Sequence, residues 1–184
     1  MAILILDMCF QRNSIYQNEF VRPITDILQK NNIKFKIKHF SSIKQKDLTN
    51  ISKIILCGVA LKDYFAWKKT DKLKFLLSFK DPILGICMGG QVIGKLFGGK
   101  LIKDLQIGVF RPKILKGDKL SYLIKDKEIY VLHNYNITKP KDFEILAEIK
   151  NSPILFKHKQ KAIYLAMFHP EVLNKDFVLE FAKL

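Results

Sequence analysis

The sequence predicts an α/β protein: a three-layer sandwich on a mostly parallel central sheet, with an antiparallel β extension. Two observations predict this fold. In the first half of the chain, short apolar runs rich in Ile, Val and Leu alternate with amphipathic stretches, and strands that alternate with helices form right-handed crossovers and a parallel sheet. After Lys100, apolar runs follow one another with only turn residues between them, which is typical of antiparallel strands.

The first half contains apolar runs of strand length and longer stretches with helical spacing. The runs are rich in β-branched residues and end at polar or turn residues, as expected of buried strands. The predicted strands are residues 2–6, 35–39, 53–57 and 82–86, and the predicted helices are residues 19–30, 72–79 and 89–97. The last of these helices stops at Gly98-Gly99, because glycine readily ends a helix.

The second half continues as successive strands and closes with a helix. The predicted strands are residues 101–102, 108–115, 128–133, 143–149, 154–157 and 162–168, followed by a helix over residues 174–184. The sequence contains no internal repeat and no long linker. A chain of 184 residues is long enough to bury one sizeable core, so we expect residues 1–184 to form a single domain.

The formal charge is +15 and comes mostly from lysines scattered along the whole chain. Such a distribution indicates either a solvated lysine-rich surface or an acidic partner. A nucleic-acid partner is not favoured, because the sequence has no aromatic-glycine RNA-binding signature and no zinc knuckle. No apolar run approaches the roughly 18–20 residues of a membrane span, and the cysteines suggest neither a disulfide framework nor a metal site. We therefore expect a cytoplasmic protein with no membrane partner, no metal and no cofactor.

One cysteine lies between glycines where a predicted strand meets a predicted helix. Residues 85–91 read GICMGGQ, so Gly85 and Gly89 flank Cys87 as the glycines of a nucleophile elbow flank its serine. A nucleophile on such a sharp turn needs small neighbours, and the N-terminus of the following helix favours a thiolate. A buried structural cysteine is the other interpretation, but the elbow context favours Cys87 as a nucleophile.

A cysteine nucleophile needs a histidine, and the histidine needs an acid to orient it. His169 follows a predicted strand and is followed two residues later by Glu171, which can reach the imidazole from the same turn. We interpret His158, in a lysine-rich stretch, as a surface residue and His39 as a structural one. His133 is not assigned by this reasoning.

These motifs together resemble a known family. Residues 85–91 match GxCxGxQ, and residues 168–171 read FHPE; in this order and separation the sequence is similar to class I (triad-type) glutamine amidotransferase domains over nearly its whole length. The resemblance implies a flavodoxin-like sheet and hydrolysis of L-glutamine to glutamate and ammonia. Cys87 would attack the carboxamide, His169 would transfer protons, and Glu171 would orient His169.

The resemblance also implies an oxyanion hole and a substrate pocket. Met88 N–H would be one oxyanion donor, and the loop after residues 53–57, at Gly58 and Val59, would supply the other. This loop reads LCGVA where relatives resemble SGGP, and Cys57 is interpreted as a small replacement for serine rather than as a redox group. The matching substrate-binding residues are Gln91, Asn134 and Tyr135, the latter two in a segment that the resemblance places at a strand end.

Family members of this length pass ammonia to a synthetase partner, so the resemblance implies such a partner here. The stretches ILILDMC and LFGGK are similar to the GMP-synthase-type branch, which belongs to purine biosynthesis, and the stretch HNY is similar to the imidazole glycerol phosphate branch. Lys62, Lys68 and Lys69 are expected to ring the mouth of the site. Two alternatives remain: a γ-glutamyl hydrolase or peptidase with the same triad, and a binding protein catalytically weakened by the altered loop.

Overall fold

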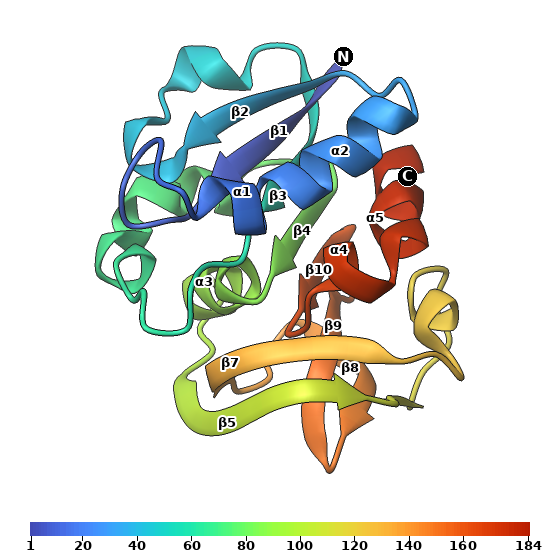
Figure 1. Ribbon diagram of the computed structural model, residues 1–184. Helices are drawn as coiled ribbons and strands as arrows, with labels where there is room; N and C mark the ends of the chain where they lie inside the picture. Colours follow the sequence, from blue (N-terminus) through green and yellow to red (C-terminus); the bar gives the residue numbers. More distant parts are fainter.

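The computed structural model describes residues 1–184, and its centre is an eight-stranded sheet in the order β2-β1-β3-β4-β10-β9-β8-β6 (Figure 1). The parallel part contains β2 (Phe35–His39), β1 (Ala2–Asp7), β3 (Ile51–Leu56), β4 (Ile83–Ile86) and β10 (Ile163–Ala166). The antiparallel part adds β9 (Ser152–His158), β8 (Phe143–Ile149) and β6 (Lys113–Ile114). A separate antiparallel ribbon pairs β5 (Leu101–Phe110) with β7 (Ile129–Ile137).

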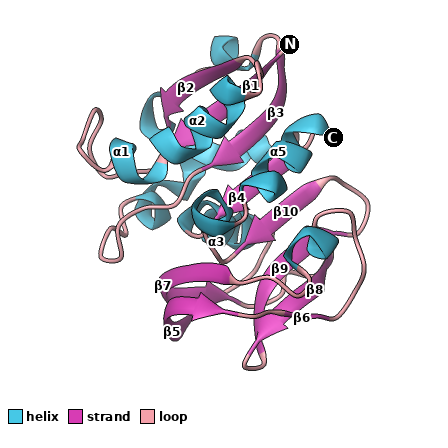
Figure 2. Cartoon of the chain, turned by 45° about the vertical axis from the view of Figure 1, so that its right-hand side comes forward, coloured by secondary structure: helices cyan, strands magenta, loops and turns pink.

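Helices cover the parallel part of the sheet (Figure 2). Helices α2 (Arg22–Lys30) and α5 (Lys175–Lys183) pack together, and α3 (Met88–Leu96) packs with a 3₁₀ segment (Ala66–Leu77). The shorter pieces are α1 (Gln17–Phe20), α4 (Pro170–Leu173) and the 3₁₀ turns Phe40–Ser42, Gln45–Leu48 and Ser121–Ile124. None of the helices has the length and apolar character needed to cross a membrane. The predicted fold class is confirmed, and the antiparallel extension is split between the main sheet and the ribbon.

Two predicted helices differ from the observed elements. The stretch predicted as one helix over residues 19–30 is divided into α1 and α2 at Val21. Pro23 explains the break, because it has no N–H to donate four residues back and its ring crowds the preceding turn. The helix predicted over residues 72–79 is part of the 3₁₀ segment Ala66–Leu77, whose buried Leu73 and Leu76 face the core together because a 3₁₀ turn contains three residues.

The ribbon also differs from its prediction. Residues 101–102 and 108–115 were expected as two strands, but β5 runs unbroken to Phe110 and ends just before Pro112, which cannot donate to a ladder. The strand predicted to end at residue 133 continues to Ile137, because Leu101 to Lys103 pair with residues 135–137. His133, Asn134 and Tyr135 therefore lie inside a strand, and their expected position at a strand end is wrong.

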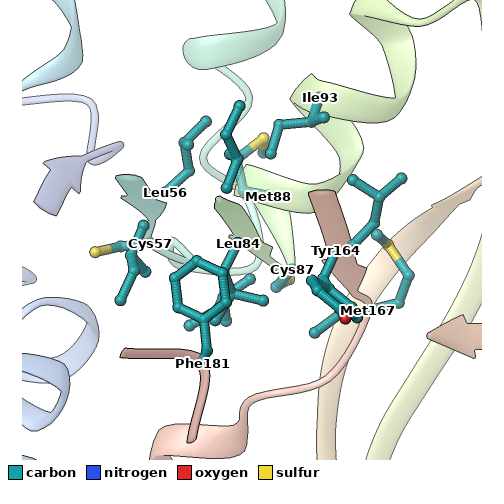
Figure 3. Packing of buried hydrophobic residues seen from close by; sticks show 14 of the residues in the cluster. Leu56, Cys57, Leu84, Cys87, Met88, Ile93, Tyr164, Met167 and Phe181 are labelled. Carbon is teal, nitrogen blue, oxygen red and sulfur yellow. The ribbon is translucent and has the colours of Figure 1, made fainter. Parts of the chain in front are cut away.

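The register of the parallel strands brings three distant loops together. Leu56 of β3 pairs with Gly85 of β4, and Ile86 of β4 pairs with Ala166 of β10. The segments that follow these strands therefore emerge at one edge of the sheet, where sites of parallel α/β proteins lie. In Figure 3, Cys57 and Cys87 mark the ends of the neighbouring strands β3 and β4.

Candidate active site

Cys87 occupies a strained turn between β4 and α3. Its φ and ψ angles are 48° and −108°, a region that residues with a side chain rarely adopt and that is often found at functional sites. Its N–H donates to the carbonyl of Ala166 (2.7 Å), and the thiol donates to the carbonyl of Leu132 in β7 (3.4 Å). The strand-to-helix turn expected from the sequence is therefore present, with the backbone of Cys87 bonded to β10 and its sulfur bonded to β7.

Gly85 and Gly89 are required by crowding around this turn. A Cβ atom at position 85 would lie 2.5 Å from the backbone nitrogen of Gly90. A Cβ atom at position 89 would collide with the carbonyl of Leu56 on β3. The glycines thus allow the N-terminal turn of α3 to pack directly on the sheet, which fixes the direction of the thiol.

His169 and Glu171 form a buried pair beside the thiol. Nδ1 of His169 lies 2.8 Å from Oε1 of Glu171, and each residue is only 2% exposed. The backbone N–H of His169 donates to the carbonyl of Tyr130 in β7 (2.8 Å). Gly58 lies against the imidazole, since a Cβ atom at position 58 would come within 2.6 Å of its Cε1 atom. The carboxylate of Glu171 and the backbone of Gly58 therefore fix the position of the imidazole, and β7 holds the backbone of His169.

Electrostatics favour a charged His169. Burial by itself lowers the pKa of this imidazole, but the nearby Glu171 carboxylate and the charge of a Cys87 thiolate outweigh burial and raise the pKa well above its ordinary value. The Nε2 atom is buried and has no hydrogen-bond partner. Because Nδ1 is taken by Glu171, Nε2 is the atom available for exchanging a proton with the sulfur or a substrate.

The predicted oxyanion donors lie around the same pocket. Met88 begins α3, and the first N–H groups of a helix have no partner within it. Val59 and Met88 both line the pocket in front of Cys87, whereas Gly58 packs behind the ring of His169. Val59 therefore lies on the pocket side of this loop, and Gly58 lies against the imidazole of His169.

The predicted substrate residues line this pocket, but their side chains are already engaged. Gln91 donates from Nε2 to the carbonyl of Tyr135 (2.5 Å) and accepts at Oε1 from the indole of Trp67 (3.1 Å). Asn134 donates to the carbonyl of Leu61 and to the hydroxyl of Tyr64, both at 3.0 Å. Trp67 was not identified from the sequence, because nothing in its local pattern indicates a contact 24 residues away.

The other histidines are structural. His39 is buried and bonds to the carbonyl of Cys9 (2.7 Å) and the hydroxyl of Ser41 (2.8 Å), as predicted. The surface assignment of His158 is wrong: it is only 5% exposed, because the rings of Phe97 and Phe143 pack around it.

His133 connects the ribbon to the segment that carries His169. It is buried, its Nδ1 atom donates to the carbonyl of Met167 (3.0 Å), and its Nε2 atom lies 3.8 Å from the carboxylate of Asp104. Burial lowers the pKa of His133 despite this carboxylate. The pKa of Asp104 is lowered, because hydrogen bonds from Ser152, Gln106 and Asn136 outweigh the effect of its partial burial.

All three cysteines are free thiols. Burial, followed by the negative charges of Glu171 and Asp7, raises the pKa of Cys57 well above its ordinary value, so this thiol stays protonated and packs as a small side chain. The structure contains no group of three or more His, Cys, Asp or Glu side chains arranged to hold a metal ion.

The fold and site together define a class of protein: a parallel α/β sheet with a cysteine elbow after one strand and a buried His–Glu pair after the next. The family model described as glutamine amidotransferase class-I matches residues 15–182. This chain belongs to the class I glutamine amidotransferase family.

Individual relatives agree with this membership. The chain is 33% identical over 181 residues to the GMP synthase (glutamine-hydrolyzing) of Borreliella burgdorferi, covering 96% of this chain and 34% of that protein. It is 35% identical over 115 residues to a glutamine-hydrolyzing GMP synthase subunit of Pyrococcus abyssi, covering 58% of this chain and 61% of that protein. The chain thus spans about a third of the length of the first of these relatives.

Solved structures support the fold. A protein assigned as a GMP synthase subunit from Thermoplasma acidophilum superposes with a TM-score of 0.84 at 22% identity, covering 100% of this chain and 92% of that one. A glutamine amidotransferase from Thermotoga maritima superposes with a TM-score of 0.73 at 18% identity, covering 93% and 76%.

Proposed function

We propose that this chain hydrolyses the side-chain amide of L-glutamine and delivers the ammonia to a synthetase of the GMP synthase type. The observation that carries the proposal is the arrangement of three residues: Cys87 in its strained elbow, and the buried His169–Glu171 pair with a free Nε2 atom. Family membership and the relatives named GMP synthase support the same activity.

In the proposed reaction, Cys87, His169 and Glu171 each act in both steps: formation of a thioester and its hydrolysis. The Cys87 thiolate attacks the carboxamide carbon, and the N–H groups of Met88 and Val59 stabilise the oxyanion. His169 gives the Nε2 proton to the departing ammonia, leaving a γ-glutamyl thioester on Cys87. His169 then takes a proton from water, the resulting hydroxide attacks the thioester, and glutamate leaves as the Cys87 thiolate is restored beside the protonated His169. Glu171 holds the imidazole in position throughout.

A synthetase partner is the second part of the proposal, and one face of the ribbon supports it. Leu105, Ile107 and Val109 alternate along β5 and are 64%, 53% and 51% exposed, which is unusual for neighbouring large aliphatic side chains. Ile107 pairs with Leu132, whose carbonyl accepts the Cys87 thiol, and Val109 pairs with Tyr130.

This apolar face is therefore continuous with the wall of the active site. The net charge of +15 opposes self-association and favours an acidic partner. We assign the face to the synthetase, because an apolar seal beside the thiol would keep ammonia from escaping to water.

The proposal is tested by measuring glutamate release from glutamine by the purified chain, alone and with the synthetase component of a GMP synthase. We expect release that is stimulated by the synthetase and abolished in Cys87→Ala, while synthesis from added ammonia by the mixed proteins stays near normal. Equal loss of glutamine-dependent and ammonia-dependent synthesis would mean that the variant fails in assembly. Release of glutamate from γ-glutamyl peptides without a synthetase would favour a peptidase instead.

A further inference from the structure

The pocket in front of Cys87 is narrow. It is lined by the segment after β3, by α3 and by β7, and its volume is about 20 Å³. A cavity of this volume holds about one water molecule. The side chain of glutamine, with several heavy atoms, does not fit. The pocket must enlarge before Cys87 can meet a substrate of that size.

Residues 61–67, which we call the lid, form the outer wall of this pocket. Up to Phe65 the lid contains no regular helix or strand. Three hydrogen bonds described above hold it against the site: Trp67 donates to Gln91, and Asn134 donates to the carbonyl of Leu61 and to the hydroxyl of Tyr64. The lid is thus held by Gln91 and Asn134, which are two of the three residues predicted to contact the substrate.

Contacts between aromatic rings also hold the lid against β7. Tyr64 stacks on Trp67 with ring centres 4.7 Å apart. Both rings meet Tyr135 of β7 edge-on, at 5.8 Å for Tyr64 and 5.0 Å for Trp67. Such contacts stabilise a pair by about 0.5–1.5 kcal/mol beyond the area that they bury. The lid is therefore a packed wall rather than a loose loop.

The lid also borders a second, open pocket. This cavity has a volume of about 410 Å³ and is lined by Phe10, Tyr16, Lys62, Phe65 and Lys68 among others. Asp63 and Tyr64 line both this pocket and the narrow pocket in front of Cys87. The lid therefore borders both spaces, and the larger one offers room for its rings to move outward.

We infer that residues 61–67 gate the active site and that Trp67 is the latch. Gln91 and Asn134 bond either to the lid or to a substrate, so lid closure and substrate binding exclude each other. Trp67 acts as a positioning residue through Gln91 and takes no part in the chemistry. The identity of the substrate rests on the proposed function, whereas the gate rests on the contacts of the lid.

The first test measures how fast Cys87 is alkylated in the purified chain. Iodoacetamide is the probe, since its reaction depends on access and not on recognition of an amino acid, and peptide mapping separates Cys87 from the other two cysteines. Trp67→Phe keeps an aromatic ring at this position but trims the indole and removes its N–H donor, and loss of one hydrogen bond should raise the alkylation rate about three- to tenfold. Tyr64→Phe, which removes an acceptor of Asn134, should give a smaller increase in the same direction.

Tyr122→Phe is the matched control, because it also trims an aromatic ring but lies outside both cavities and is 60% exposed. Its alkylation rate should equal that of the wild type. Rates in Trp67→Phe and Tyr64→Phe that both match the control, in proteins with unchanged melting temperature, would overturn the gate.

The second test uses the fact that Trp67 is the single tryptophan of the chain. In Cys87→Ala, which binds without turnover, saturating glutamine should shift the fluorescence of Trp67 to longer wavelength as the indole leaves Gln91. Glutamine binding that is measured by calorimetry and leaves the fluorescence unchanged would contradict the latch. Absence of any glutamine binding, together with faster alkylation of Trp67→Phe by iodoacetamide, would uphold the gate and overturn the proposed substrate.

Discussion

Gly58 lies so close to His169 that a Cβ atom at position 58 would sit 2.6 Å from Cε1 of the imidazole and 3.3 Å from Nδ1. Carbon atoms in ordinary contact are about 3.5–4.0 Å apart, so any larger residue must displace the ring or the loop. The glycine after β3 therefore sets the position of a side chain that lies more than a hundred residues further along the chain.

Gly58→Ala should consequently impair glutamine hydrolysis more than folding. A shift of the imidazole of about 1 Å is expected to lower kcat on the order of 100-fold, while the added methyl group destabilises the fold by about 1–3 kcal/mol. Steady-state glutamate release and thermal melting measure the two effects separately. Ala60→Gly, a change of similar size on the same loop, provides a comparison, and equal kcat in Gly58→Ala and wild type would show that His169 is not held by this contact.

The proposed triad predicts how strongly the loss of each member reduces kcat. His169→Asn should reduce kcat nearly as much as loss of the Cys87 thiol, because the imidazole transfers both protons, whereas Glu171→Gln should retain more activity because it only orients the ring. When residues act as a unit, the reductions in kcat caused by their separate loss do not add up. The double variant Cys87→Ala/His169→Asn should therefore be little worse than either single variant. Losses that multiply in the double variant would place the two residues in separate sites.

The buried His169–Glu171 pair also predicts how stability depends on pH. The pKa of His169 is raised in the folded state, so its contribution is fully present below the ordinary histidine value of about 6.5 and is lost as pH rises through the folded value. Glu171→Gln removes the main cause of the raised pKa. Urea unfolding should show this variant about 1.5–3 kcal/mol less stable than wild type at pH 6, with the difference shrinking as the pH rises through the pKa of His169 in the folded chain.

A difference in unfolding free energy that grows toward pH 9 would contradict this sign and show that the imidazole is neutral in the folded chain. Lys127, which pairs with Asp176 at an exposed position (2.7 Å), supplies the control. Lys127→Gln should change stability little at either pH, because exposed ion pairs contribute at most about 1 kcal/mol.

Sequence patterns predicted the strands, the elbow at Cys87 and the His169–Glu171 pair because each is encoded locally. The glycines lie within two residues of the thiol, and the acid lies within two residues of the imidazole. Parallel strand order then brings the two motifs to one edge of the sheet.

Other parts of the site depend on long-range packing and could not be predicted in this way. The contact between Asp104 and His133 requires the register of β5 and β7, which shifts between Lys103 and Gln106. The hydrogen bond from Trp67 to Gln91 joins the 3₁₀ segment Ala66–Leu77 to α3, 24 residues further along the chain. His158 is buried by rings from two other elements, although its lysine-rich neighbours are typical of a surface.

The last prediction concerns the lysines near the site and the proposed synthetase. Lys62 and Lys68 line the 410 Å³ cavity beside the lid, and Lys69 is exposed next to them. If these charges dock an acidic face, stimulation of glutamate release by the synthetase should weaken as salt rises, because exposed charges are screened over roughly 10 Å at 0.1 M salt. Lys62→Glu/Lys68→Glu/Lys69→Glu should then need more synthetase for half-maximal stimulation at low salt and should approach wild type at high salt.

If docking depends instead on the apolar face of β5, stimulation by the synthetase should not weaken as salt rises. This difference in salt dependence separates the two contributions to docking. Ile107→Asp should weaken stimulation at every salt concentration, since it removes apolar area and buries a charge at the interface. Lys34→Glu/Lys36→Glu/Lys46→Glu, which changes exposed lysines at β2 and on the 3₁₀ turn Gln45–Leu48, controls for net charge. Identical stimulation curves for the wild type and the Lys62/Lys68/Lys69 variant at all salt concentrations would exclude the lysines from docking, and a normal curve for Ile107→Asp would exclude the apolar face.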